Sequence, residues 1–360
     1  MKNNTTPRVF IAATRQNDGK TTTSLGLIAA LQKEFPRIGY IKPVGQRFVE
    51  IEEQKIDEDT VLMDSVYGLN CPLVDMSPIA VEPDFTRKYL QAANNEALVK
   101  KIQNAFDRVA WEKDFVLCEG SGHAGVGAVF DLSNAQVAKH LGCKVIIVSR
   151  GGIGKPIDEV ALNQALFEKE GVEIIGVIIN KVLEDKVDYI ADFARRGLKR
   201  KGLDLLGVIP HRAILSQPTM DLIREELRAE VLNDPPTLHA PVEDVIVGAM
   251  GAQNALRFFK RGALLITPGD REDILTVACA CGEEMAGVVL TGGLRPSNGA
   301  LRTVREMRIP VLLARDDSYQ VASMVHDLTV KTRPTDGEKI SLIRDLVAKN
   351  VNVKKILDSL

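Results

Sequence analysis

The stretch VFIAATRQNDGKTTTSLGL, residues 9–27, constrains the fold of this chain more than any other feature. An apolar run is followed by a short polar turn, then by Gly19-Lys20-Thr21 and an apolar pattern with helical spacing. A strand that leads through a tight turn into a helix presents backbone N–H groups at the helix N-terminus, where anions bind. The usual phosphate-loop pattern has a glycine five residues before Gly19, and here that position is Thr14. We therefore predict a phosphate-binding loop with one departure from its pattern.

The first part of the chain alternates short apolar runs with amphipathic helical patterns, such as residues 22–34 and 158–171. The predicted strands are RVFIAA (8–13), RIGYIKPV (37–44), FVLCEG (115–120), KVIIVSR (144–150), IIGVIIN (174–180) and LLGVIP (205–210). Continuous apolar strands separated by helices are typical of a parallel sheet covered on both faces. We predict an α/β fold with a phosphate loop at the end of its first strand.

The paired prolines Pro235 and Pro236 interrupt this alternation and favour a linker over residues 233–242. After it the alternation resumes with DVIVGAM, ALLITPG, GVVLTGG and IPVLLAR, each followed by a helical pattern. We predict a nucleotide-binding domain over residues 1–232 and a second, smaller α/β domain over residues 243–360. The last stretch, from Asp336 onward, is expected to form one or two helices of that second domain.

Composition excludes several classes of function. A formal net charge of -2 gives no global field that would favour nucleic acid. No apolar run approaches the roughly 18 residues that cross a bilayer, and the N-terminus lacks a signal-peptide core. The five cysteines form no CxxC pair and are expected to be reduced, mostly buried thiols: Cys71, Cys118, Cys143, Cys279 and Cys281. We predict a cytoplasmic protein with no membrane and no nucleic-acid partner.

The Gly-Lys-Thr segment carries the expected phosphate chemistry. Lys20 would supply a positive charge to the β and γ phosphates, and the Thr21 hydroxyl would hold a magnesium ion. The alternative is a polar connection in which Gly-Lys-Thr occurs by chance. The residues expected to surround the nucleotide phosphates are Asn17, Asp18, Gly19, Lys20, Thr21 and Thr22.

Two more strand ends carry charged side chains. Lys42 lies near the end of the strand at 37–44 and is followed by Pro43, and Glu119 lies near the end of the strand at 115–120. The carboxyl ends of parallel strands line the crevice where ligands bind, and a carboxylate at such a tip suits a magnesium ion. The alternatives are a solvated lysine and a salt-bridged or helix-capping glutamate. His123, in the loop after Glu119, either touches substrate or is solvated.

The order of these segments resembles a known group of phosphate-loop proteins. The chain has a phosphate loop, a strand with KPV, an acidic segment, a strand ending in EG, and a strand ending in NKV before LGVIP. In this it is similar to the dethiobiotin synthetase and cobyrinic acid diamide synthase group. VGAM at 247–250, LLITPGDREDI at 264–274 and GVVLTGG at 287–293 resemble the DRTGG domain. The pairing is similar to the N-terminal region of long-form phosphate acetyltransferases.

The resemblance implies a magnesium site made by Thr21, Glu119 and Asp59. The position of the last ligand stays open, because Asp57 or Asp64 fits the pattern equally well.

The resemblance also implies catalytic roles for Lys20 and Lys42, with Lys42 facing the transferred phosphoryl group or an acceptor carboxylate. Asn180 and Pro210 would border the base, and the Asn180 amide would read the adenine edge. In the second domain Arg271 and Arg295 either hold an anionic ligand or are solvated.

Three functions remain in competition. The first is a regulator or ATPase that binds ATP and Mg2+, related to the N-terminal region of phosphate acetyltransferase. The second is an ATP-dependent ligase that activates a small carboxylate, and the third is an interaction scaffold with a vestigial loop. The resemblance further implies a homodimer. We do not expect a complete phosphate acetyltransferase, because in the long enzymes the acetyl-transfer domain follows the DRTGG domain.

Overall fold

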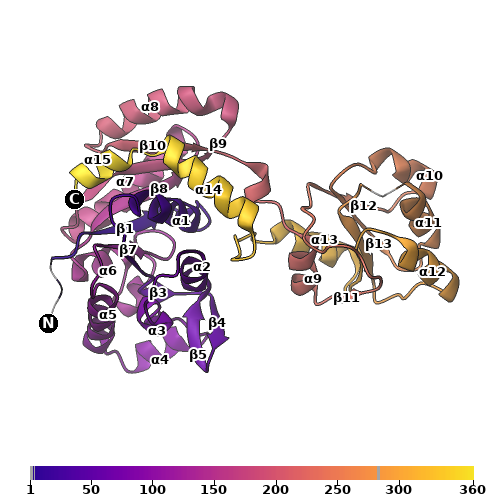
Figure 1. The fold of residues 1–360 in the computed structure, drawn as a ribbon, viewed down its shortest axis with the longest axis horizontal. Coiled ribbons are helices and arrows are strands. Elements are labelled where there is room, and N and C mark those ends of the chain that lie inside the picture. Colours follow the sequence, from indigo (N-terminus) through magenta and orange to yellow (C-terminus); the bar gives the residue numbers. More distant parts are fainter. Residues whose placement is uncertain (1–2, 4, 282–283) are drawn as a thin grey trace. The chain divides into compact units, whose positions relative to one another are not determined.

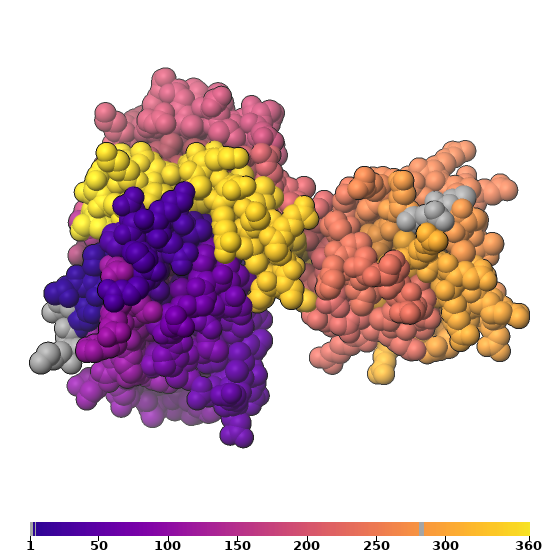
Figure 2. Space-filling view, in the orientation of Figure 1, coloured from indigo at the N-terminus to yellow at the C-terminus, as the bar shows by residue number. Residues whose placement is uncertain are grey.

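The computed structural model describes residues 3, 5–281 and 284–360. It divides into two compact units, drawn as a ribbon in Figure 1 and in a space-filling view in Figure 2. The first unit contains Met1–Arg212 and Thr332–Leu360, and the second contains Ala213–Lys331. Each is an α/β unit, as the sequence predicts.

A six-stranded parallel sheet in the order β10-β9-β8-β1-β7-β2 forms the centre of the first unit. Its strands are β1 (Arg8–Ala13), β2 (Ile38–Ile41), β7 (Phe115–Glu119), β8 (Lys144–Arg150), β9 (Ile174–Val182) and β10 (Leu205–Pro210). In β1, Ile11 is paired with Glu119 of β7 on one side and with Ile146 of β8 on the other. Because β1 is central, the turn that follows it lies in the middle of the carboxyl edge of the sheet.

Helices cover both faces of this sheet (Figure 1). The main ones are α1 (Lys20–Leu31), α2 (Glu58–Tyr67), α5 (Asn95–Val109), α6 (Asn134–His140), α7 (Gly154–Lys169), α8 (Val187–Lys199), α14 (Gly337–Asn350) and α15 (Val353–Asp358). Shorter elements fill the connections: β3 (Val44–Gly45), β4 (Phe48–Ile51), β5 (Gln54–Asp57), α3 (Leu73–Met76), β6 (Ile79–Ala80), α4 (Phe85–Gln91), η1 (Ala128–Phe130) and η2 (Glu184–Lys186).

The C-terminal helices α14 and α15 belong to the first unit, so their expected place in the second domain is wrong. The buried apolar side chains of α14 include Ile343 and Val347, and α14 lies against α1. The approach is close at Gly26 of α1, where a Cβ atom would lie 2.2 Å from Cγ2 of Val347. The amphipathic pattern of this segment predicts a helix but does not identify the surface that its apolar side covers.

The second unit has a five-stranded sheet in the order β11-β15-β14-β13-β12, parallel except for β11. Its strands are β11 (Glu230–Val231), β12 (Asp244–Val247), β13 (Ala263–Pro268), β14 (Gly287–Thr291) and β15 (Val311–Leu313). Its helical elements are η3 (Ala213–Leu215), α9 (Met220–Leu227), α10 (Ala252–Ala255), η4 (Leu256–Phe258), α11 (Glu272–Cys281), α12 (Asn298–Glu306) and α13 (Ser318–Asp327).

The expected linker over residues 233–242 lies inside this second unit and does not separate two domains. The Asn233 amide donates to the carbonyls of Met307 and Ile309 and accepts from the Val311 backbone N–H. The chain instead passes between units at Arg212 and Lys331. Paired prolines mark a break in regular structure, and here the break is a connection within one unit.

No helix in the described ranges has both the length and the apolar character needed to cross a membrane. Four of the cysteines are free thiols, of which Cys118 and Cys143 are buried and Cys71 and Cys279 are partly buried. The side chain of Cys281 lies outside the described part of the structure.

Candidate functional site

The turn after β1 has the backbone shape of an anion-binding loop. Asn17 and Gly19 have positive φ angles of 66° and 98°, and Gly19 is the N-cap of α1. The helix begins without a side-chain cap and without an acidic residue in its first turn, which instead carries Lys20. The first N–H groups of a helix have no partner within the helix, so this terminus is suited to a phosphate.

Thr14 fits the loop because its backbone is not among the left-handed residues of the turn. Its hydroxyl donates to Oδ2 of Asp18 at 2.7 Å and lies 3.1 Å from the hydroxyl of Ser149. Oδ2 of Asp18 also accepts from the Arg15 backbone N–H at 2.8 Å. The Asp18 carboxylate, whose pKa burial raises, therefore closes the turn from inside. Thr14 therefore gives the loop a side-chain hydrogen bond that a glycine would lack.

Two consecutive residues of β9 hold the loop from the side. Nδ2 of Asn180 donates to the Asp18 carbonyl at 2.9 Å, and Nζ of Lys181 donates to the Asn17 carbonyl at 2.7 Å. Oδ1 of Asn180 accepts from the Lys181 backbone N–H at 2.8 Å, so both polar atoms of this amide are engaged. A Cβ atom on Gly19 would lie 2.0 Å from Nδ2 of Asn180, which requires glycine there.

These contacts add a role that the sequence did not predict. Lys181 is not among the site residues expected from the sequence. Its place beside Asn180, in the NKV run at the end of a buried strand, could have indicated that it also reaches the loop. Because both polar atoms of the Asn180 amide are engaged with the chain, a loop-holding role competes with the base-edge role expected from the sequence. The base-bordering role of Pro210, which ends β10 beside Val182 of β9, stays a prediction.

We expect Asn180→Ala to weaken the binding of ATP and of GTP by a similar factor, about tenfold. The variant removes the hydrogen bond to the Asp18 carbonyl, and loss of one such buried bond costs on the order of 1–3 kcal/mol. Calorimetric titration with both nucleotides is the measurement. A loss confined to ATP would show that the amide reads the adenine edge instead.

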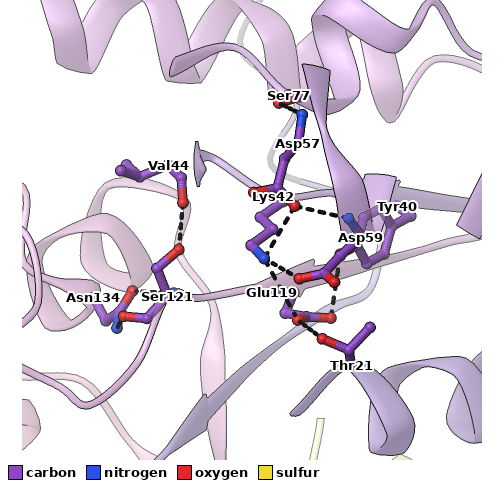
Figure 3. A network of polar contacts seen from close by, with 10 residues as sticks. All are labelled: Thr21, Tyr40, Lys42, Val44, Asp57, Asp59, Ser77, Glu119, Ser121 and Asn134. Carbon is purple, nitrogen blue, oxygen red and sulfur yellow. Dashed lines mark hydrogen bonds and ion pairs between the residues drawn. The ribbon is translucent and has the colours of Figure 1, made fainter. Parts of the chain in front are cut away.

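A buried cluster of charges lies beside the loop (Figure 3). Nζ of Lys42 contacts Oδ2 of Asp59, lies 3.1 Å from Oδ1 of Asp57, and is 4.0 Å from Oε1 of Glu119. Lys42 follows β2, Asp57 ends β5, and Asp59 lies in the first turn of α2. The structure thus brings Lys42 and Glu119, which the sequence places at strand ends, together with Asp59, which the family resemblance implies as a magnesium ligand.

Glu119 connects this cluster to the phosphate loop. The Thr21 hydroxyl donates to its Oε1 at 2.9 Å, and the buried Tyr40 hydroxyl donates to its Oε2 at 3.2 Å (Figure 3). Tyr40 was not an expected site residue. Only the parallel pairing of β2 with β7, which places Tyr40 beside Leu117, brings its ring to the glutamate.

Burial and the neighbouring charges together set the pKa values of the groups in this cluster. Burial raises the pKa of Glu119 and of Asp57, against the opposing effect of Lys42. Burial disfavours the charged form of Lys42, yet Asp59, Asp57 and Glu119 outweigh it, and the pKa of this lysine lies above its usual range. The pKa of Lys20 is lowered, first by burial, so this cation lacks a full set of anionic partners. A phosphate group would supply them.

The donor set is suited to magnesium rather than to a softer metal. Among residues 3, 5–281 and 284–360, no three His, Cys, Asp or Glu side chains form a ready metal site. Magnesium, however, is usually bound by one or two carboxylates together with substrate phosphates and water. Thr21 and Glu119 provide a hydroxyl and a carboxylate within hydrogen-bonding distance of each other. Hard oxygen donors of this kind fit the ion.

The structure also distinguishes between the three aspartates that the sequence offers for the third magnesium ligand. Asp57 and Asp59 both contact Lys42. Asp64 lies near the end of α2, where its Oδ1 accepts from the Leu69 backbone N–H at 3.2 Å. Its role there is to close the helix end, so Asp64 is not part of the cluster.

Other charged or polar candidates are engaged locally. His123 is exposed, and its Nδ1 accepts from the Gly125 backbone N–H. In the second unit Arg271 pairs with Asp273 at 2.9 Å, and Arg295 pairs with Glu230 at 2.5 Å. Each arginine is therefore paired with a carboxylate of the second unit.

Comparison with known proteins gives two family matches and several relatives. A family profile described as an AAA domain matches residues 7–219, and one described as a DRTGG domain matches residues 222–328. The chain is 26% identical to a phosphate acetyltransferase of Nitratidesulfovibrio vulgaris, over 97% of this chain and 51% of that protein. It is 29% identical to a phosphate acetyltransferase of Pseudomonas putida, over 95% of this chain and 50% of that protein. The chain therefore spans about half the length of the curated relatives it matches.

Among solved structures, the MinC:MinD cell division protein complex of Aquifex aeolicus is similar with a TM-score of 0.38 and 18% identity. The likeness covers 58% of this chain and 83% of that chain.

Proposed function

Because the chain belongs to the AAA domain family through residues 7–219, we propose that its first unit binds ATP with Mg2+ and works as a nucleotide-dependent regulator or ATPase. The DRTGG domain at 222–328 is then the part of the chain that responds to the bound nucleotide. In this proposal the chain corresponds to about half the length of the phosphate acetyltransferases that it matches, and acetyl transfer is not assigned to it.

The observation that carries this proposal is the charge balance beside the loop. Three buried carboxylates, Asp57, Asp59 and Glu119, face two buried ammonium groups, Lys42 and Lys20. With all five groups charged, three negative charges less two positive charges leave one negative charge in a site with almost no solvent. Burying an unbalanced charge is costly, so the carboxylate side of the site, around Lys42, favours an added cation such as Mg2+, while Lys20 and the start of α1 are left for the phosphates.

The residues have separate tasks in this proposal. Lys20 and the N–H groups at the start of α1 bind the β and γ phosphates, and Gly19 gives the backbone its turn. Thr21, Asp59 and Glu119 would hold Mg2+, which would neutralise part of the phosphate charge. Asn180 and Lys181 keep the loop in shape. Tyr40 and Lys42 orient the carboxylates.

The ligase alternative is less favoured by the position of Lys42. Its ammonium group is already in contact with Asp59 and Asp57, at the centre of the cluster. An acceptor carboxylate would have to displace one of these aspartates in a site that already has excess negative charge. Two carboxylates in contact with the same ammonium group repel each other strongly when solvent is excluded.

We expect slow ATP hydrolysis that does not change when small dicarboxylates and amino acids are added singly. The reason is that the ammonium group of Lys42, where an acceptor carboxylate would bind, already contacts Asp59 and Asp57. Phosphate release from the full chain, with and without each compound, is the measurement, and Lys20→Ala provides the background rate. A compound that raises the rate several-fold, in the wild-type protein only, would assign the ligase function instead.

We also propose that the protein is a homodimer. Exposed aromatic side chains on the surface of the first unit support this, and they are considered next.

A further inference from the structure

One exposed stripe of α8 has a charge pattern that complements itself. It consists of Asp185 in η2, immediately before α8, and of Tyr189, Phe193, Arg196 and Arg200. Tyr189, Phe193, Arg196 and Arg200 recur every three or four positions and therefore lie on one side of α8, and Asp185 precedes them in the turn that leads into the helix. The opposite side, with Ile190, Ala194 and Leu198, is buried. Figure 1 shows α8 beside β9 and β10 with its other side on the outer surface of the first unit.

The middle of the stripe is aromatic and exposed to solvent. Tyr189 and Phe193 are 58% and 40% exposed, and their ring centroids are 4.8 Å apart. The guanidinium carbon of Arg196 lies 5.6 Å from the Phe193 ring centroid. A helix dipole favours acidic residues at the start of a helix and basic residues at its end. It does not account for two large aromatic rings in contact on the exposed side between them.

The ends of the stripe carry unmatched charges of opposite sign. In the part of the chain that the structure describes, neither the Asp185 carboxylate nor the Arg200 guanidinium forms an ion pair. Both side chains are exposed. Their neighbours are paired within the chain, Glu184 with Arg212 and Asp192 with Arg196.

We propose that this stripe is the surface through which a second copy of the chain binds, with the two α8 helices antiparallel about a two-fold axis. An axis between positions 192 and 193 places Asp185 opposite Arg200 of the partner subunit, and Tyr189 opposite Arg196 of the partner subunit. Phe193 lies at the centre. A two-fold interface uses the same patch twice, so each of these contacts occurs twice. Aromatic residues and arginine are also the residue types that most often dominate binding surfaces.

The inference rests on the proposed homodimer and names its surface, and it does not depend on nucleotide binding. Dimer formation and ATP affinity are measured separately, so either one can fail while the other holds.

The test is a charge swap, followed by analytical ultracentrifugation of the full chain at low and high salt. We expect the wild type to form a dimer at micromolar concentration. Asp185→Lys alone and Arg200→Glu alone should each weaken it by about tenfold or more, because each places two like-charged pairs in the interface. A mixture of the two single variants should form a heterodimer, since both of its contacts are then attractive. The double variant Asp185→Lys/Arg200→Glu should dimerise like the wild type.

Arg195→Glu is the matched control, because Arg195 is exposed on the same helix and is not three or four positions from any stripe residue of α8. It reverses one charge and should leave the dimer intact. A wild-type protein that sediments only as a 39.4 kDa species would overturn the proposal. Single variants that dimerise like the wild type, or a mixture that does not recover dimer, would also overturn it.

Discussion

Lys20→Ala is expected to lower the affinity for magnesium-ATP by roughly a hundredfold, about 2.7 kcal/mol. Lys20 is 9% exposed, and its pKa is lowered, first because of burial. A charge-assisted contact in a site with little solvent is worth more than the same contact in water. The helix terminus remains in the variant, so a weak phosphate site should persist. Calorimetric titration of both proteins with magnesium-ATP is the measurement.

Lys33→Ala is the matched control for this experiment. Lys33 is exposed just beyond the other end of α1, so its removal changes the net charge equally without touching the loop. Its affinity should equal that of the wild type. Equal affinities for Lys20→Ala and wild type would contradict the proposed site and would favour the scaffold function with a vestigial loop.

Lys42→Met is expected to destabilise the protein at neutral pH by about 3–5 kcal/mol. The variant keeps the apolar stem of the side chain but leaves Asp57, Asp59 and Glu119 without their central cation. Loss of one partner from a buried ion cluster is more damaging than loss of a surface pair, because the remaining charges stay buried. Urea unfolding, followed by circular dichroism and by the fluorescence of Trp111 in the first unit, is the measurement.

The loss should shrink as the pH falls. Burial already raises the pKa of Asp57 from 3.8 and that of Glu119 from 4.5, and without Lys42 both values rise further. A carboxyl group with a raised pKa in the folded state costs no stability below its unfolded pKa, and its destabilising effect grows as the pH rises from the unfolded to the folded value. In the wild type Lys42 has a raised pKa, so its contribution is present throughout the range below 10.5. The difference between the two proteins should therefore be larger at pH 8 than at pH 5, as a consequence of this linkage.

Lys55→Met serves as the control for charge and side-chain length. Lys55 pairs with Glu82, and both side chains are well exposed, at 39% and 44%. Its substitution should leave the unfolding midpoint within error at every pH. A Lys42→Met protein whose stability loss is the same at pH 5 and pH 8 would contradict the assignment of the carboxylates as the source of that loss.

The sequence by itself determined the strands and the loop of the first unit. β1, β8 and β10 have the predicted bounds, and α1 begins at Lys20, within the predicted Gly-Lys-Thr segment. These features depend on local information: an apolar run gives a buried strand, and glycine with a polar turn gives the change to a helix. Lys42 and Glu119 were also found in this way, because parallel strands end at a common edge.

Only the tertiary structure decided which distant residues complete the site and which unit the chain ends join. Asn180 reaches Asp18 across 162 positions, and Tyr40 reaches Glu119 across 79. Asp57 and Asp59, but not Asp64, contact Lys42, and this choice depends on where α2 begins. The apolar side of α14 lies against α1, although the segment follows the second unit in sequence. Such contacts are set by strand order and packing between segments, and a local pattern of residues does not contain that information.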